Sequence, residues 1–122
     1  MKHILVVDDS PTIRKAIRRI LEQLGHKVEE VGDGQEAIDR LEAGGRFDAI
    51  LCDIDMPNVD GLAFLGALPN HPRISPPPII MCTTHTSFDK ISLALTLGAS
   101  EYIMKPFDGD IIASKLDACG VT

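Results

Sequence analysis

Three aspartates, a threonine and a lysine each follow a short apolar run in this chain of 122 residues. These residues, with the runs before them, are Asp8 and Asp9 after 4–7, Asp53 after 49–52, Thr83 after 79–82, and Lys105 after 102–104. Apolar runs of about four residues bounded by turn signals are typical of buried strands in a parallel sheet. The carboxyl ends of such strands meet at one edge, where functional groups gather. We therefore expect the acids, the hydroxyl and the ammonium to lie together.

The chemistry that this set could perform follows from its charges. Carboxylates at one sheet edge repel one another unless a cation holds them, and Mg²⁺ prefers oxygen ligands and pairs with phosphate. A carboxylate can itself attack a phosphoryl group and form an aspartyl phosphate, a transfer that needs mainly positioning and neutralisation of oxygen charge. Lys105 could supply that charge, and the Thr83 hydroxyl could donate one hydrogen bond. The set predicts a site for Mg²⁺ and a phosphoryl group.

The segments between these runs predict helices that alternate with strands. Ser10 is a favourable N-cap, Pro11 fits the first helical position, and Gly25 ends the predicted first helix. Further helices are expected over 35–43, 62–68 and 111–118, and one more is expected to end at 97. Further strands are expected over 27–31, 48–52, 79–82 and 101–104. The proline-rich segment 69–78 is expected to be an extended connection without helix. This alternation predicts a parallel sheet with right-handed crossovers.

Composition limits the classes of protein that remain. The chain is 44% hydrophobic and 25% charged, which is ordinary for a globular domain, and its length fits one domain over 1–122. A net charge of −6 argues against nucleic acid or an anionic membrane as the partner. No apolar run approaches the ~18 residues of a membrane span, and the start is too short to be a signal peptide. We expect a cytoplasmic monomer, in which the separated Cys52, Cys82 and Cys119 are small buried thiols.

Several segments resemble, in order, the motifs of the receiver domains of two-component response regulators. They are Ile-Leu-Val-Val-Asp-Asp-Ser at 4–10, Asp-Ala-Ile-Leu-Cys-Asp-Ile-Asp-Met-Pro-Asn-Val-Asp-Gly at 48–61, Thr83-Thr84, and Gly-Ala-Ser-Glu-Tyr-Ile-Met-Lys-Pro-Phe at 98–107. The resemblance covers essentially the whole chain. With the alternating pattern, it implies a flavodoxin-like α/β fold, a five-stranded parallel sheet with helices on both faces.

The resemblance also implies roles for individual residues. Asp53 would accept a phosphoryl group from a histidine kinase or phosphotransfer protein, as self-modification rather than enzymatic turnover. Mg²⁺ would be bound by Asp9, Asp53 and the backbone carbonyl of Asp55, with Asp8 helping through water. Lys105 would contact the phosphate and precede a cis peptide at Pro106.

A switch is implied as well. Phosphorylation would draw Thr83 toward Asp53, Tyr102 would swing inward, and the surface of the fourth helix, the fifth strand and the last helix would change its affinity for a partner. The segments 8–15 and 101–107 most resemble CheY-type chemotaxis regulators, particularly those of alphaproteobacteria, whose partner is the flagellar motor switch. No output domain follows, so the chain resembles a stand-alone receiver. Such receivers also act as phosphorelay intermediates or phosphate sinks.

Other classes fit the residues less well. Asp53-Ile54-Asp55 resembles the DxD pair of a small phosphatase, but that motif normally follows the first strand of a longer chain. A calcium loop built on Asp53, Asp55 and Asp60 lacks the glycine and glutamate that such loops require. The complete set of site residues argues against a degenerate receiver that acts only as a scaffold.

Two further features have more than one interpretation. Asp55, Thr84 and His85 occupy positions that flank the path of the hydrolytic water in receivers, and our hypothesis is that Thr84 slows entry of phosphodonor and water.

The predicted first helix carries a basic face, which is either solvated or a docking surface for the phosphodonor. This face consists of Arg14, Lys15, Arg18 and Arg19.

Overall fold

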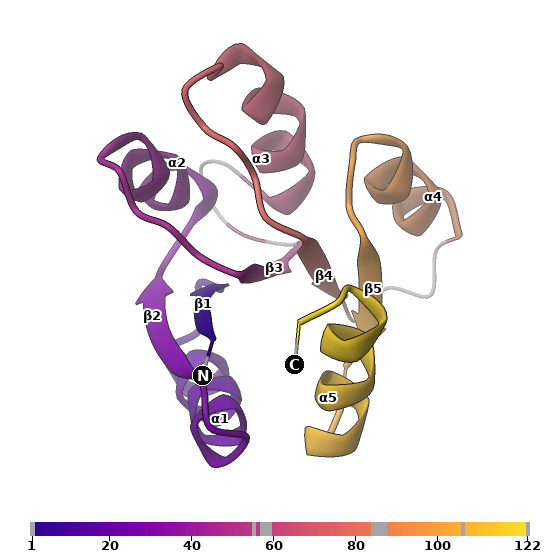
Figure 1. Cartoon of the computed structure of the whole chain (residues 1–122). Helices are drawn as coiled ribbons and strands as arrows, with labels where there is room; N and C mark the ends of the chain where they lie inside the picture. Colours follow the sequence, from indigo (N-terminus) through magenta and orange to yellow (C-terminus); the bar gives the residue numbers. More distant parts are fainter. Residues whose placement is uncertain (1, 55, 57–59, 84–87, 106, 122) are drawn as a thin grey trace.

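The computed structural model describes residues 2–54, 56, 60–83, 88–105 and 107–121. Its five strands form one parallel sheet in the order β2-β1-β3-β4-β5. The strands are β1 (His3–Val7), β2 (Lys27–Val31), β3 (Ala49–Asp53), β4 (Ile79–Thr83) and β5 (Glu101–Met104). The α-helices are α1 (Pro11–Gln23), α2 (Gly34–Glu42), α3 (Gly61–Ala67), α4 (Phe88–Thr96) and α5 (Gly109–Ala118). Helices α1 and α5 cover one face of the sheet, and α2, α3 and α4 cover the other (Figure 1).

The expected α/β fold is confirmed, with element ends that differ by one or two residues from the predicted ones. One prediction for the proline-rich segment was wrong, because Leu68–Asn70 forms a turn of 3₁₀-helix. Pro69 is compatible with this turn because the first residues of a helix need no hydrogen-bonded N–H. The rest of the segment, up to β4, is irregular, as expected.

Side-chain caps fix the points at which four helices begin after the preceding strands. In each case the capping oxygen accepts a hydrogen bond from the backbone N–H three residues later, at 2.8–3.3 Å. The caps are Ser10 for α1, Asp33 for α2, Asp60 for α3 and Asp108 for α5. Each such cap stabilises its helix by about 1 kcal/mol. The caps therefore determine how closely each helix follows the end of its strand.

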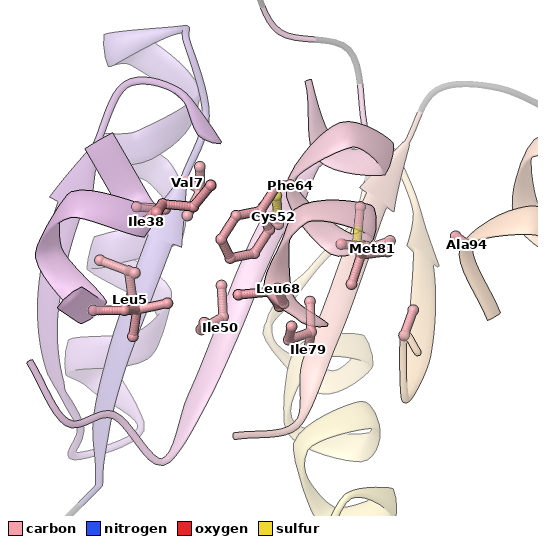
Figure 2. Packing of buried hydrophobic residues seen from close by; sticks show 14 of the residues in the cluster. Leu5, Val7, Ile38, Ile50, Cys52, Phe64, Leu68, Ile79, Met81 and Ala94 are labelled. Carbon is pink, nitrogen blue, oxygen red and sulfur yellow. The ribbon is translucent and has the colours of Figure 1, made fainter. Parts of the chain in front are cut away.

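The core lies on both faces of the sheet, because successive strand residues point in opposite directions. Leu5 and Val7 of β1 belong to a cluster under α2, α3 and α4, which Figure 2 shows from close by. Ile4 and Val6 belong to a second cluster, which contains Ile17 of α1 and residues of α5. Both clusters are mostly aliphatic, as expected for strands covered on both sides. The packing fixes the strand ends from which the predicted site residues project.

Gly61, the first residue of α3, is required by a close approach to the end of β3. A Cβ atom at this position would lie 2.4 Å from the carbonyl oxygen of Asp53 and 2.7 Å from Cε of Met81. The amide of Gly61 donates a hydrogen bond of 2.9 Å to the carbonyl of Ile54. The absent side chain therefore lets α3 begin directly against the backbone of Asp53.

We predict that Gly61→Ala lowers the free energy of unfolding by roughly 1–3 kcal/mol, the usual cost of overpacking a well-packed site. Gly66→Ala, on the same helix, is the matched control, because a Cβ there meets nothing within 4 Å. The control should be neutral or stabilise by up to about 1 kcal/mol, since alanine favours helix more than glycine does. Urea unfolding followed by circular dichroism measures both. Equal effects of the two substitutions would contradict the steric argument.

Candidate functional site

The structure brings the predicted acids and lysine together at the carboxyl edge of the sheet. Asp8 and Asp9 follow β1, Asp53 is the last residue of β3, and Lys105 follows β5. One carboxylate oxygen from each of the three aspartates lies within 4.8 Å of the others. The Lys105 ammonium lies 3.1 Å from Oδ2 of Asp8 and 3.4 Å from Oδ1 of Asp53. These four residues form what we call the acid site.

The acid site combines buried and accessible charge. Asp8 and Asp53 are only 2% and 7% exposed, whereas Asp9 is exposed. Burial lowers the pKa of Lys105, but the charge of Asp53 and the hydrogen bond and charge of Asp8 outweigh it, so its pKa lies above the ordinary value. Lys105 is therefore a cation at neutral pH. Its charge offsets part of the repulsion between the two buried carboxylates.

Asp8 is held at each of its polar atoms. Its backbone N–H donates to the carbonyl of Val31 at 3.2 Å. Its Oδ1 accepts from the amide of Ser10 at 2.9 Å, and its Oδ2 accepts from Lys105 at 3.1 Å. Its carbonyl accepts from Nη1 of Arg14 at 2.7 Å. Asp8 is thus a fixed acid, whereas Asp9 is exposed.

The donor set fits Mg²⁺ in chemistry and in dimensions. Mg²⁺ takes oxygen ligands at 2.0–2.1 Å in octahedral geometry, so opposite ligands lie about 4.2 Å apart. Three carboxylate oxygens within 4.8 Å of one another need only small movements to share such an ion. The exposure of Asp9 leaves a path for the ion and for the waters that Mg²⁺ usually keeps.

Thr83 and Tyr102 lie on the same face of two neighbouring strands. Thr83, the last residue of β4, is fully buried and is paired with Met104 of β5. Tyr102 stands two residues before Met104, so the two side chains are diagonal neighbours on that face. Tyr102 is half-buried and packs against the cluster under α2, α3 and α4. Nζ of Lys115, on α5, lies 5.4 Å from the centre of its ring.

The cysteines do not contribute to the acid site. Burial raises the pKa of the Cys82 thiol to about 12, and it raises the pKa of Cys52 well above its ordinary value. Both are buried protonated thiols, as expected, and Cys119 is half-buried near the end of α5. Asp60 caps α3.

Some predictions fall on residues that the structure does not describe. The carbonyl ligand at Asp55, the cis peptide before Pro106 and the role of Thr84 and His85 all lie outside the described residues. Sequence reasoning missed Arg14, which was assigned to a basic surface and instead contacts the backbone of Asp8. The order of the strands and their register, which bring these groups together, are not visible in the spacing of the sequence.

The chain matches a family model over residues 4–117, and that model describes the response regulator receiver domain. This chain is a receiver domain. The match covers far more than half of the sequence, and it agrees with the parallel sheet and with the acids at its carboxyl edge. Receiver domains accept phosphoryl groups and bind Mg²⁺ at clustered aspartates, and the acid site is a group of this kind.

Individual relatives agree with this assignment. The receiver domain is 36% identical to the chemotaxis protein CheY1 of Helicobacter pylori over 115 residues, 93% of each protein. It is also 36% identical to the CAI-1 autoinducer sensor kinase/phosphatase CqsS of Vibrio cholerae over 118 residues, but these make up 17% of that protein. The crystal structure of the chemotaxis response regulator CheY4 of Vibrio cholerae matches with a TM-score of 0.86 at 34% identity, covering 98% of both chains. The small phosphatase is therefore not favoured.

CheY-like receivers interact with histidine kinases and with output targets such as flagellar switch proteins. Among the described residues, no helix has the length and apolar character needed to cross a membrane. By its family match and its relatives, the chain is a two-component signalling domain close to the CheY chemotaxis proteins.

Proposed function

We propose that this receiver domain accepts a phosphoryl group on Asp53 from a phosphohistidine, with Mg²⁺ bound, and thereby changes its affinity for an output protein. The observation that carries this proposal is the convergence of Asp8, Asp9 and Asp53 around the Lys105 ammonium at one sheet edge. Such a transfer needs little besides positioning and neutralisation of charge, and this arrangement offers both.

Asp53 is the best nucleophile among the three acids. It ends the central strand β3, between β1 and β4, so acids and lysine surround it from both sides. Asp8 has both carboxylate oxygens in hydrogen bonds, and Asp9 is exposed at the rim. In the reaction an Asp53 oxygen bonds to phosphorus while the bond from phosphorus to the donor nitrogen breaks. Lys105 neutralises charge on the phosphoryl oxygens.

Asp9, Asp53 and Asp8 are the residues that would hold the metal, with the carbonyl of Asp55 as a further ligand. Bound Mg²⁺ would supply positive charge to the phosphoryl oxygens, in addition to the charge of Lys105. Asp9 would bind the ion directly from the rim, and Asp8 would act through water because Ser10 and Lys105 already occupy its oxygens.

The proposed switch is carried by Thr83 and Tyr102. The Thr83 hydroxyl would hydrogen-bond to the phosphoryl group on Asp53, and Tyr102 would move into the space that this leaves. Helix α4, strand β5 and helix α5 would then present an altered surface to the partner. Exposed Leu93, Leu95 and Leu97 on or next to α4 and Ile111 on α5 support a role for this region in binding.

The biological setting follows from the relatives. We propose a cytoplasmic, monomeric regulator of chemotaxis that acts on the flagellar motor switch, because CheY1 and CheY4 are chemotaxis proteins. The second candidate is a phosphorelay intermediate or phosphate sink, which the match to part of a sensor kinase supports. In both settings Asp53 is phosphorylated, and the phosphoryl group later leaves it, by hydrolysis to phosphate or by transfer to the next protein of a relay, without turnover of a separate substrate.

The first prediction from the proposed function tests the phosphoacceptor. The wild-type protein should gain one phosphoryl group from acetyl phosphate with Mg²⁺, measured by intact mass, and should lose it on treatment with hydroxylamine. Asp53→Asn should fold and remain unmodified. Asp60→Asn, which replaces a nearby acid and keeps a capping side chain, should be modified as the wild type is. Labelling of a folded Asp53→Asn protein would show that the nucleophile lies elsewhere.

A second prediction tests the metal site. Asp9→Asn should leave the metal-free protein at least as stable as the wild type, because it removes one of three repelling charges. It should weaken the stabilisation by Mg²⁺, and each tenfold loss of affinity removes about 1.4 kcal/mol at saturating Mg²⁺. Asp108→Asn, which keeps the cap of α5, is the control. Thermal unfolding with and without Mg²⁺ measures the effect, and equal stabilisation of both variants would exclude Asp9 as a ligand.

A third prediction tests the switch. Thr83→Ala should still bind the phosphoryl analogue BeF₃⁻, but the resulting changes in the ¹H–¹⁵N NMR spectrum at Tyr102 and in α5 should be much smaller than in the wild type. Thr96→Ala, whose lost hydroxyl bonds only to Ser92 in the described part of the chain, should respond fully. If the spectrum at Tyr102 changes fully in Thr83→Ala, the response of Tyr102 does not depend on the Thr83 hydroxyl and the proposed coupling is wrong.

A further inference from the structure

We propose that Arg14 is a positioning residue of the acid site, which it holds through the peptide that joins Asp8 to Asp9. The inference rests on the proposed function. It adds to the acid site a residue that the sequence analysis had grouped with the basic face of the first helix. It follows from two contacts of the Arg14 side chain, one with Glu30 of β2 and one with the carbonyl oxygen of Asp8.

The four basic residues of α1 divide into two pairs. Lys15 and Arg19 are exposed. Arg14 and Arg18 instead extend to Glu30 on β2, with Nε of Arg14 at 3.2 Å from Oε1 and Nη1 of Arg18 at 2.6 Å from Oε2. The side chains of Arg14 and Glu30 are only 20% and 18% exposed. Arg14 is therefore part of the packed structure and not of a solvated face, whereas the Arg18 side chain is still 41% exposed.

The guanidinium of Arg14 contacts both Glu30 and the acid site. Its Nη1 donates a hydrogen bond of 2.7 Å to the carbonyl oxygen of Asp8. That carbonyl belongs to the peptide between Asp8 and Asp9, so its orientation sets the direction in which the chain leaves β1. A rotation of this peptide would move the Asp9 carboxylate relative to those of Asp8 and Asp53. Arg14 thus fixes the relative placement of two of the three acids.

Glu30 makes this contact rigid. It stands opposite Val6 in the register of β1 and β2, one residue before the pairing of Val7 with Val31. Burial raises the pKa of Glu30, but its hydrogen bonds to Arg18 and Arg14 outweigh burial, and its pKa lies below the ordinary value. A charged Glu30 holds the planar guanidinium of Arg14 in a geometry that a lysine could not reproduce. We call the chain of contacts from Glu30 through Arg14 to the Asp8 carbonyl the arginine bracket.

Arg14 could affect Mg²⁺ affinity through its charge or by positioning the metal ligands, and the two roles predict opposite changes when it is removed. A cation close to the acid site repels Mg²⁺, so loss of its charge alone would tighten metal binding. Loss of a group that orients metal ligands weakens binding, typically by 10–100-fold. The sign of the change in Mg²⁺ affinity therefore distinguishes a positioning residue from a nearby charge.

The experiment compares Mg²⁺ affinity, by isothermal titration calorimetry, in four variants of the whole chain. Arg14→Ala and Arg14→Lys should each weaken Mg²⁺ binding roughly tenfold. Arg18→Ala, which leaves the bond from Arg14 to Asp8, should have a smaller effect, and Lys15→Ala should cause no loss of affinity. The second measurement is the ¹H–¹⁵N resonance of the Asp9 amide without metal, because this N–H belongs to the oriented peptide. It should shift in both Arg14 variants and not in Lys15→Ala.

The outcomes are distinguishable. Weaker Mg²⁺ binding together with a displaced Asp9 amide in a folded Arg14→Lys protein supports the arginine bracket. Unchanged or tighter binding overturns it, and so does weaker binding with an unmoved Asp9 amide. If the wild-type protein neither binds Mg²⁺ nor takes a phosphoryl group from acetyl phosphate, the proposed function fails and this inference fails with it. If the wild type does both and the Arg14 variants match it, the inference alone is wrong.

Discussion

The repulsion between carboxylates at one sheet edge is the constraint around which this domain is organised. Parallel strands that are covered on both faces bring Asp8 and Asp53 into a buried position, where an uncompensated charge is costly. Lys105 compensates part of that charge from the end of β5. The remaining negative charge favours a divalent cation at this edge, and receiver domains bind Mg²⁺ at clusters of this kind. The same excess of negative charge lowers the stability of the folded domain and favours metal binding. An edge with more compensating positive charge would attract a divalent cation less strongly.

The backbone around the acids is held more tightly than a simple loop would be. Gly61 lets α3 start against the carbonyl of Asp53, and Ser10 both caps α1 and donates its amide to Asp8. Arg14 binds the carbonyl of Asp8 from the next turn of α1. Phosphoryl transfer depends mainly on positioning and electrostatics, so these contacts contribute to the chemistry although none of them touches a reacting atom.

The sequence was sufficient for the strands and for the residues at their ends, because both are local signals. Apolar runs bounded by glycine and aspartate mark the strands, and the polar residue that follows each run lies at the carboxyl edge in any parallel arrangement. The contact of Arg14 with Glu30 and Asp8 could not be foreseen, because it depends on β2 lying beside β1 in one register. The contact of Lys115 with the Tyr102 ring likewise depends on how α5 packs. The 3₁₀ turn at Pro69 was missed because the prolines of segment 69–78 were taken together to exclude helix, although a single proline is compatible with the start of a turn.

The two faces of the sheet have different relations to the acid site. The arginine bracket reaches the site from α1, whose buried residues Ile17 and Leu21 pack in the cluster that also contains residues of α5. Tyr102 packs in the cluster of the opposite face, and Thr83 points to that same face by alternation along β4. Close-packed clusters change between discrete arrangements rather than deforming gradually, so the proposed shift of Thr83 would pass to Tyr102 within the cluster of that face. The acid site would thus be held from the α1 face and would communicate its state through the opposite face, and α5, which packs in the cluster of α1 and places Lys115 against the Tyr102 ring, would connect the two.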